Sequence, residues 1–322
     1  MQAIQITQTG GPEVLIPRDL PTPTPGPGEV LIQIEACGVN FIDVYQREGR
    51  YPVKLPFIPG QEAAGTVVAL GPGAAGVAVG DRVAWCHSLG TYAQLAVAPA
   101  RLLVRIPEGI GFQQAAAAML QGMTAHYLAH STYPIQPGDE VLIHAGAGGV
   151  GLLLVQMAKQ LGARVFTTVS TELKAALART AGADEAVLYT QEDFAAKVRE
   201  LTGGKGVAAV YDSVGKTTFD ASLTCLRPRG LLVLFGGSSG AVPPLDLIRL
   251  STLGSLYLTR PSLKDYLATR EELQLRAGDV LQWVAEGKLK LRLEHTYPLA
   301  AAAQAHRDLE GRKTAGKILL IP

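Results

Sequence analysis

The first third of the chain alternates between apolar and polar residues with the period of a β-strand. Glycine and proline mark turns between short apolar runs, and the proline-rich segment 21–28 predicts an extended connector. Closely spaced short strands of this kind are typical of a barrel or a sandwich. Strands are predicted at residues 2–8, 29–35, 63–70, 82–86 and 92–97.

A different rhythm begins near residue 112, where helical periodicity predicts helices at 112–119 and 124–130. From residue 140 onward, short apolar runs alternate with amphipathic segments, which predicts a parallel sheet covered by helices on both faces. The expected strands are 140–144, 164–169, 186–189, 208–212 and 231–235, and the expected helices are 150–161, 172–181, 194–201 and 219–223.

The alternation stops after Gly254. The pattern then predicts a strand at 255–259 and a helical stretch at 263–286. Beyond these, the tail holds an apolar run at 289–293, a helix near 300–309 and a last strand at 317–321. We expect this tail to rejoin the first part of the chain.

Composition narrows the function classes. A chain of 322 residues predicts two domains, and 48% hydrophobic with 18% charged residues is typical of a folded protein. The net charge of +1 offers no global attraction for nucleic acid or an anionic membrane. No secretory signal and no membrane span is visible, so we expect a cytoplasmic protein.

The three cysteines, Cys37, Cys86 and Cys225, are far apart and form no CxxC pair. Their spacing argues against a disulfide framework and against a structural zinc cluster. We expect small buried thiols.

The sharpest local signal is a glycine-rich turn between a predicted strand and a predicted helix. Gly146, Gly148 and Gly151 form G-x-G-x-x-G, and the residues between the last two are Gly149 and Val150. A diphosphate must approach the backbone closely, so a Cβ there would obstruct it, and a helix N-terminus favours an anion. This context predicts a dinucleotide site. The alternative is a glycine turn kept for packing alone.

The next strand bears on the choice of cofactor. NAD sites carry an acidic residue at its end, but here Ser170 follows, and Lys174 lies one turn into the next helix. A hydroxyl and a lysine suit a 2′-phosphate, so NADPH is preferred over NADH. Two alternatives stay open, because Lys174 can be an ordinary surface lysine and Glu172 lies nearby.

Several motifs, in an order that spans nearly the whole chain, together resemble one family. They are the segment 138–151 with Gln156 and Lys159, and the segments 38–43, 59–65, 80–83, 211–215, 235–240 and 258–262. The chain is similar to the medium-chain dehydrogenase/reductase superfamily, and within it to the quinone oxidoreductase (zeta-crystallin-like) family.

The resemblance implies an α/β architecture: a Rossmann doubly wound parallel sheet domain plus a GroES-like β-barrel catalytic domain. It implies that residues 1–123 form the GroES-like catalytic domain and that 124–262 form the dinucleotide-binding domain. Residues 263–322 would be a return segment that completes the catalytic domain.

The resemblance also indicates that zinc is absent. Zinc alcohol dehydrogenases of this superfamily have Cys at the position of Asn40 and His at the position of Gln61, and a third ligand falls near Gln121. Neutral amides are poor substitutes for thiolate and imidazole as zinc ligands. Without a Lewis acid, reduction of an activated acceptor is favoured over alcohol oxidation.

The resemblance implies that Asn40, Tyr45 and Tyr51 are the catalytic residues at the nicotinamide end of the site. Read from the sequence alone, Asn40 is equally a turn or cap residue, and the tyrosines are loop-packing residues. Thr124 otherwise looks like a cap at a helix start, and Arg312 like a surface arginine. The implied cofactor contacts are Asn40, Thr124, Gly146, Gly148, Gly149, Val150, Ser170, Lys174, Tyr189, Ser213, Phe235, Gly236, Thr259 and Arg312.

The leading hypothesis is a zinc-independent, NADPH-dependent quinone oxidoreductase whose partner is a small quinone or an electrophilic carbonyl. An enal or enoyl-thioester reductase, with Tyr51 as a proton donor, is an enzymatic alternative. A cofactor-binding protein with an RNA-binding role is another, but the charge balance argues against it. We also expect a homodimer, formed where strands 231–235 and 255–259 meet a second subunit at a sheet edge.

Overall fold

The alternating second part of the chain forms a six-stranded sheet in the computed structural model, which describes all 322 residues. Its strands are β8 (Glu140–His144), β9 (Arg164–Val169), β10 (Glu185–Leu188), β11 (Val207–Asp212), β12 (Leu226–Leu234) and β13 (Tyr257–Thr259). They lie in the order β10-β9-β8-β11-β12-β13, and every neighbouring pair is parallel. All six carboxyl ends therefore meet at one edge of the sheet.

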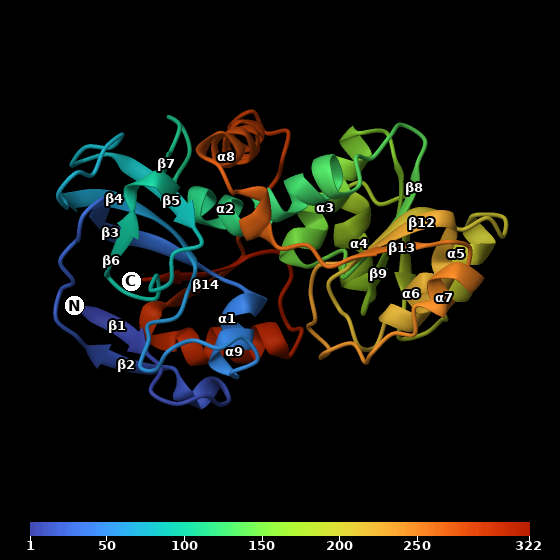
Figure 1. Cartoon of the computed structure of the whole chain (residues 1–322), viewed down its shortest axis with the longest axis horizontal. Helices are drawn as coiled ribbons and strands as arrows, with labels where there is room; N and C mark the ends of the chain where they lie inside the picture. The colour runs from blue at the N-terminus through green and yellow to red at the C-terminus, as the bar shows by residue number, and fades with distance from the viewer. The chain divides into compact units, whose positions relative to one another are not determined.

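Helices connect these strands and cover both faces of the sheet. They are α3 (Gly149–Gln160), α4 (Glu172–Thr180), α5 (Phe194–Leu201), α6 (Phe219–Cys225) and α7 (Ile248–Thr252). Figure 1 shows α3 and α4 on one side of the sheet and α5 and α6 on the other. The central strands β8 and β11 are buried along nearly their whole length, as strands covered on both faces must be. The predicted doubly wound α/β fold is confirmed.

The short strands of the first third and the tail build a second, mostly antiparallel sheet. Its members are β3 (Glu29–Val39), β4 (Glu62–Leu70), β5 (Arg82–Cys86), β6 (Leu95–Pro99), β7 (Val104–Arg105), β14 (His295–Pro298) and β15 (Ile318–Ile321). The order is β14-β15-β3-β4-β5-β7, and β6 also pairs with β3. The separate strands β1 (Gln2–Gln5) and β2 (Ile16–Asp19) form an antiparallel pair.

The chain divides into two compact units, one of residues Met1–Met123 with Leu267–Pro322 and the other of Thr124–Tyr266. In the first unit, β15 from the tail pairs with the long strand β3, and Leu319 lies opposite Gly38. A core of alternating strand residues, including Ile32, Val67 and Trp85, fills this unit. The remaining helices are α1 (Phe41–Arg47), α2 (Phe112–Tyr127), α8 (Arg270–Ala285) and α9 (Ala302–Glu310).

The prediction of two helices at 112–119 and 124–130 is wrong. One helix, α2, runs from Phe112 to Tyr127 and continues as a π-helical turn, Leu128–Thr132. Gly122 does not interrupt it, because this glycine has a packing role: a Cβ there would lie 2.6 Å from Val280 Cγ1 on α8. Thr124 is therefore an interior helix residue and caps no helix start.

The chain after Gly254 differs from the prediction in two places. The apolar run 289–293 belongs to no helix or strand, and the short strand β14, which was not predicted, lies just after it. The predicted helical stretch 263–286 is broken before α8, where Thr269 and Glu272 form a capping box that starts a new helix. The helix α1 was not predicted at all. No helix in the structure combines the length and the apolar composition that crossing a membrane requires.

Candidate functional site

The glycine-rich turn connects the end of β8 to the start of α3. Ala145 adopts a left-handed conformation with φ of 54°, and the Gly146 amide donates to Thr168 O at 3.2 Å. The helix begins at Gly149 after Gly148, with no side-chain cap and no acidic residue in its first turn. The first amides of a helix have no acceptor within it, so Gly149, Val150 and Gly151 present donors that the chain leaves to a ligand.

The three glycines of the motif differ in what a side chain would meet. A Cβ on Gly146 would overlap the Thr167 hydroxyl, and one on Gly151 would overlap the Ala145 carbonyl oxygen. A Cβ on Gly148 would meet only that same oxygen, at 3.1 Å. The explanation that a Cβ would obstruct a diphosphate therefore applies to Gly148, whereas Gly146 and Gly151 are required by the packing of the turn itself.

The other predicted cofactor residues of this unit lie at the carboxyl ends of the same parallel strands. Ser170 follows β9, Tyr189 follows β10 and Ser213 follows β11. Phe235 and Gly236 follow β12, and Thr259 ends β13. In open α/β sheets, ligands bind along this edge.

Lys174 lies in the first turn of α4, where Thr171 caps the helix by accepting from the Lys174 amide at 3.3 Å. Ser170 directly precedes this cap. Glu172 is the one acidic residue of the helix's first turn. A phosphate at this helix start would therefore meet the Lys174 ammonium and the helix dipole, opposed by Glu172.

A buried polar network under this edge was not predicted. Asp212, at the end of β11, accepts from the amides of Val214 and Gly215 at 2.8 and 2.9 Å, and from the Thr218 hydroxyl at 2.7 Å. His144 hydrogen-bonds the Thr168 and Ser222 hydroxyls, each at 2.9 Å. Burial lowers the pKa of His144, so the ring is neutral. These contacts hold the loop that carries Ser213.

The predicted catalytic residue Asn40 lies between the end of β3 and the start of α1, and 4% of its surface is exposed. Its amide nitrogen donates to Glu62 Oε1 at 2.8 Å. Its amide oxygen accepts from Gln121 Nε2 at 3.1 Å and from Lys317 Nζ at 2.9 Å. Glu62 and Lys317 form a buried ion pair. Neither residue was predicted for the site, although Glu62 follows Gln61 in one of the family motifs.

The two predicted catalytic tyrosines lie together. Tyr45 is buried in α1, and its ring packs edge-on against Tyr51, with the centroids 5.3 Å apart. The Arg50 guanidinium lies over the Tyr45 ring at 4.2 Å. Tyr51, which follows the helix, is 42% exposed. The interpretation of Tyr45 as a loop-packing residue is wrong, because it is helical, whereas Tyr51 lies in a loop.

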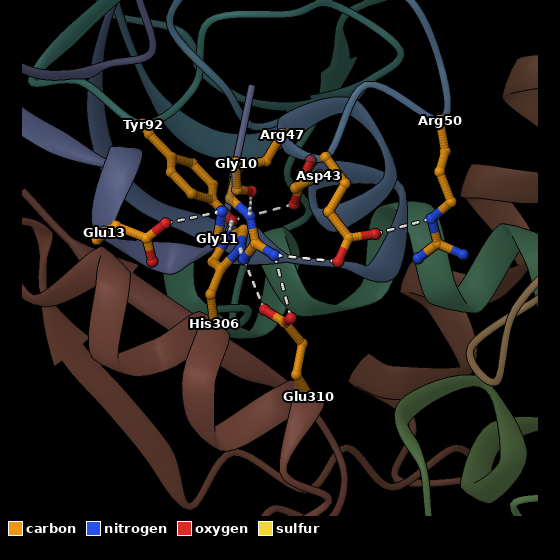
Figure 2. A network of polar contacts seen from close by, with 10 residues as sticks. Gly10, Gly11, Glu13, Asp43, Arg47, Arg50, Tyr92, His306 and Glu310 are labelled. Carbon is orange, nitrogen blue, oxygen red and sulfur yellow. Dashed lines mark hydrogen bonds and ion pairs between the residues drawn. The ribbon is translucent and has the colours of Figure 1, made fainter. Parts of the chain in front are cut away.

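Behind α1, a chain of polar contacts connects that helix to α9 (Figure 2). Arg47 is fully buried; it binds both oxygens of Glu310 at 2.6 and 3.0 Å and donates to His306 Nδ1. Because arginine only donates, His306 carries its hydrogen on Nε2 and gives it to the Tyr92 hydroxyl at 3.1 Å. Tyr92 in turn donates to Asp43 Oδ2 at 3.0 Å.

Burial controls the protonation of the side chains in this hydrogen-bonded network. It lowers the pKa of His306 to about 3, with Arg47 adding to the effect, and it raises the pKa of Asp43 to about 7. Burial also raises the pKa of Tyr92, so this hydroxyl stays protonated. Asp43 Oδ2 also accepts from the backbone N–H of Asn40 at 2.8 Å, and this hydrogen bond fixes the start of α1. The Asp43 side chain is fully buried.

The residues at the expected zinc position do not fit a zinc ion. Asn40 offers an amide oxygen that already accepts from Gln121 and from the ammonium of Lys317. A lysine cation in contact with this oxygen opposes a second cation there. No group of three His, Cys, Asp or Glu side chains is arranged to bind a metal. The three cysteines are free and buried, as expected.

The two remaining predicted cofactor residues are Thr124 and Arg312. Thr124 is buried inside α2. Arg312 follows the end of α9 in a left-handed conformation with φ of 56°. Arg312 belongs to the first compact unit, whereas the glycine turn belongs to the second.

Comparison with known proteins gives consistent relatives. Residues 26–108 match the alcohol dehydrogenase GroES-like domain family, and residues 149–282 match the zinc-binding dehydrogenase family. The chain is 47% identical over 321 residues to a quinone oxidoreductase of Pseudomonas aeruginosa, covering 99% of each chain. It is 43% identical over 330 residues to a 2-haloacrylate reductase of Burkholderia, covering 100% of this chain and 99% of that protein.

A solved mycobacterial protein in complex with NADPH is similar over its whole length. It has 52% sequence identity and a TM-score of 0.98, and 100% of each chain is covered. The predicted combination of a GroES-like domain with a doubly wound sheet is thereby confirmed. The order of its motifs, its fold and these full-length relatives agree: the chain belongs to the quinone oxidoreductase family of the medium-chain dehydrogenase/reductase superfamily.

Proposed function

We propose that this protein is an NADPH-dependent oxidoreductase that reduces quinones and related conjugated carbonyl compounds. The observation that carries the proposal is the bare start of α3, where Gly148 has no side chain and the helix has no cap of its own. A diphosphate there would accept from the amides of Gly149, Val150 and Gly151. The relatives named above support the same chemistry.

Selection of NADPH over NADH is assigned to the start of α4. Ser170 and Lys174 offer a hydroxyl and an ammonium to a 2′-phosphate, and the end of β9 carries no carboxylate to bind ribose hydroxyls. The attraction of the Lys174 ammonium for the phosphate must exceed the repulsion from the Glu172 carboxylate in the same helical turn. We also keep Arg312 as a candidate phosphate contact.

Bound NADPH supplies a hydride from its nicotinamide ring. This chain contributes binding and orientation: Tyr189, Ser213, Phe235, Gly236 and Thr259 line the strand ends that would hold the dinucleotide. Asn40 offers an amide N–H to the ribose or to an acceptor oxygen, and Tyr51, which is 42% exposed, carries a hydroxyl that can donate. Hydrogen bonds of this kind polarise an acceptor carbonyl and stabilise the negative charge that hydride addition creates.

The acceptor class has a second candidate. The similarity to a 2-haloacrylate reductase makes an α,β-unsaturated acid the second candidate substrate. Such a reaction needs a proton at the carbon next to the carboxylate, and the Tyr51 hydroxyl is the candidate donor in this chain. Quinone reduction needs protons on oxygen only, which water supplies.

The test is NADPH oxidation by the purified protein against a panel of quinones, enals and 2-haloacrylates, with NADH as the cofactor control. We expect quinone-dependent oxidation that is faster with NADPH than with NADH. Absence of NADPH binding by calorimetry, together with no turnover of any acceptor, would refute the proposal. Tyr51→Phe separates the acceptors, because it should slow haloacrylate reduction more than quinone reduction.

We further propose a homodimer formed through β13. This strand is the open edge of the parallel sheet, and Tyr257 on it is 63% exposed. Leu247 and Ile248, at the start of α7, are 72% and 65% exposed. The other strand expected at the interface, β12, is interior to the sheet, between β11 and β13. An open edge beside exposed apolar side chains is a typical pairing surface.

Light scattering at micromolar concentration tests this arrangement. We expect a dimer that Tyr257→Glu converts to a monomer, whereas Leu275→Glu leaves it intact, because Leu275 is a comparably exposed residue on α8. A wild-type monomer would contradict the dimer proposal.

A further inference from the structure

The buried ion pair of Lys317 and Glu62 lies where the last strand meets the strand that precedes Asn40. The antiparallel register pairs Leu319 with Gly38 and Ile318 with Val39, and its continuation brings Lys317 opposite Asn40. Only 3% of Lys317 and none of Glu62 is exposed. A Cβ on Gly38 would overlap both the Glu62 carboxylate and the Lys317 side chain, so the glycine makes room for the pair.

The hydrogen bonds of the Asn40 side-chain amide leave one of its N–H groups for a ligand. The oxygen accepts from Lys317 Nζ and Gln121 Nε2, which uses both of its lone pairs. The nitrogen donates one hydrogen to Glu62 Oε1. What remains is one N–H, so Asn40 can act toward a ligand only as a donor.

Charge excludes the flipped amide. Exchange of the two ends would set the amide hydrogens against the Lys317 ammonium and the amide oxygen against the Glu62 carboxylate. Both contacts would then be repulsive in a buried site, where such interactions are strong. Glu62 is itself held, because its second oxygen accepts from the Leu120 amide of α2 at 2.7 Å.

Burial lowers the pKa of Lys317 to about 7, whereas contact with the Glu62 carboxylate favours the charged ammonium. The same contact compensates the carboxylate, which would otherwise be a buried charge without a partner.

We propose that Lys317 is a positioning residue of the reaction: with Glu62, it locks the Asn40 amide so that its free N–H donates to the bound acceptor or cofactor. This inference rests on the proposed function, in which Asn40 binds one of these groups. A lysine next to the end of the chain thereby sets the hydrogen-bonding polarity of a residue at the start of α1.

The experiment is a double-mutant cycle on kcat for quinone reduction with Lys317→Met and Asn40→Ala. We expect Lys317→Met to lower kcat about tenfold to a hundredfold, the range typical of residues that orient a functional side chain. In the Asn40→Ala background, the same change should lower kcat by no more than about twofold, because the amide it orients is gone. Lys317→Arg should restore part of the loss, since guanidinium also donates to Asn40.

Two further measurements separate this role from general support of the fold. Lys288→Met is the control, because Lys288 forms an exposed ion pair with Glu286 in the same unit and should leave kcat unchanged. If Lys317→Met does not fold, Gln121→Met removes the other donor to Asn40 without leaving a buried charge, and it must show the same dependence on Asn40. Losses of kcat that multiply across the cycle would overturn the inference.

Calorimetric titration with NADPH tells the two possible failures apart. NADPH binding by wild type and by Lys317→Met at similar affinity, combined with multiplying losses of kcat, would refute only the role of Lys317. No NADPH binding by the wild type would refute the proposed function and this inference together.

Discussion

Replacing single glycines of the turn by alanine separates a ligand requirement from a folding requirement. A Cβ on Gly151 would come well inside 3.0 Å of the Ala145 carbonyl oxygen, a backbone atom that cannot move alone. We expect Gly151→Ala to lower the free energy of unfolding by about 2–4 kcal/mol, the range for overpacking a close contact.

Gly148→Ala should behave differently. Its φ of −75° suits alanine, and the new Cβ would meet the same oxygen at 3.1 Å, so a shift of a few tenths of an ångström relieves the contact. That small cost is offset by about 0.4–1 kcal/mol, because alanine restricts the unfolded chain. The free energy of unfolding should therefore change by less than about 1 kcal/mol.

The assay pairs urea unfolding with calorimetric titration of NADPH for both variants. A Cβ at Gly148 would stand between the backbone and the diphosphate, so we expect NADPH affinity to fall about tenfold or more, which corresponds to about 1.4 kcal/mol. Wild-type NADPH affinity in a normally folded Gly148→Ala would refute the reasoning, because the diphosphate would then not lie against this turn.

Three further perturbations test the charges described above. Lys174→Ala should weaken NADPH binding about tenfold or more while changing NADH binding little, and equal losses in calorimetry would remove its role at the 2′-phosphate. Arg47→Met leaves Glu310 without its partner and should lower the free energy of unfolding in urea by about 3–5 kcal/mol, whereas R47M/E310M should cost less than R47M alone. Between about pH 6.5 and pH 4, His306 becomes protonated in the unfolded chain but stays neutral in the folded protein, where burial lowers its pKa to about 3. The free energy of unfolding of the wild type should therefore fall by about 3 kcal/mol relative to that of His306→Gln as the pH decreases across this window. Asp43 has the opposite effect on the free energy of unfolding, but it is present in both proteins and cancels in the comparison. Parallel pH profiles of unfolding for the two proteins would contradict the prediction.

Periodicity was sufficient for the parallel sheet because its strands are buried on both faces and its helices are amphipathic. The predicted bounds of the strand 164–169 and of the helix 194–201 match those of β9 and α5. Periodicity failed where tertiary packing decides. Gly122 lies in the gap between the two predicted helices, but in the structure it is inside α2 and packs against Val280. The strand β14 has only four residues and no long apolar run, so its pairing with β15 sets its conformation.

The candidate site was predictable as far as it follows motifs. The glycine turn and the strand-end residues lie along one edge because parallel strands share a direction. Lys317 and Glu62 were out of reach, since they are 255 positions apart and neither residue type alone indicates a buried pair. The T-x-x-E capping signal of Thr269 and Glu272 was present in the sequence and would have placed the start of α8.

The pairing of β15 with β3 has a consequence for the newly made protein. Cys37 and its partner Leu320 are 283 positions apart, so the ribosome must synthesise the whole second unit before the first sheet can close. Residues 124–266 are contiguous and have no such delay. During synthesis, the Glu62 carboxylate lacks its ammonium partner until Lys317 and the final strand are made. Residues 1–123 should therefore stay incompletely folded until the last residues of the chain are available.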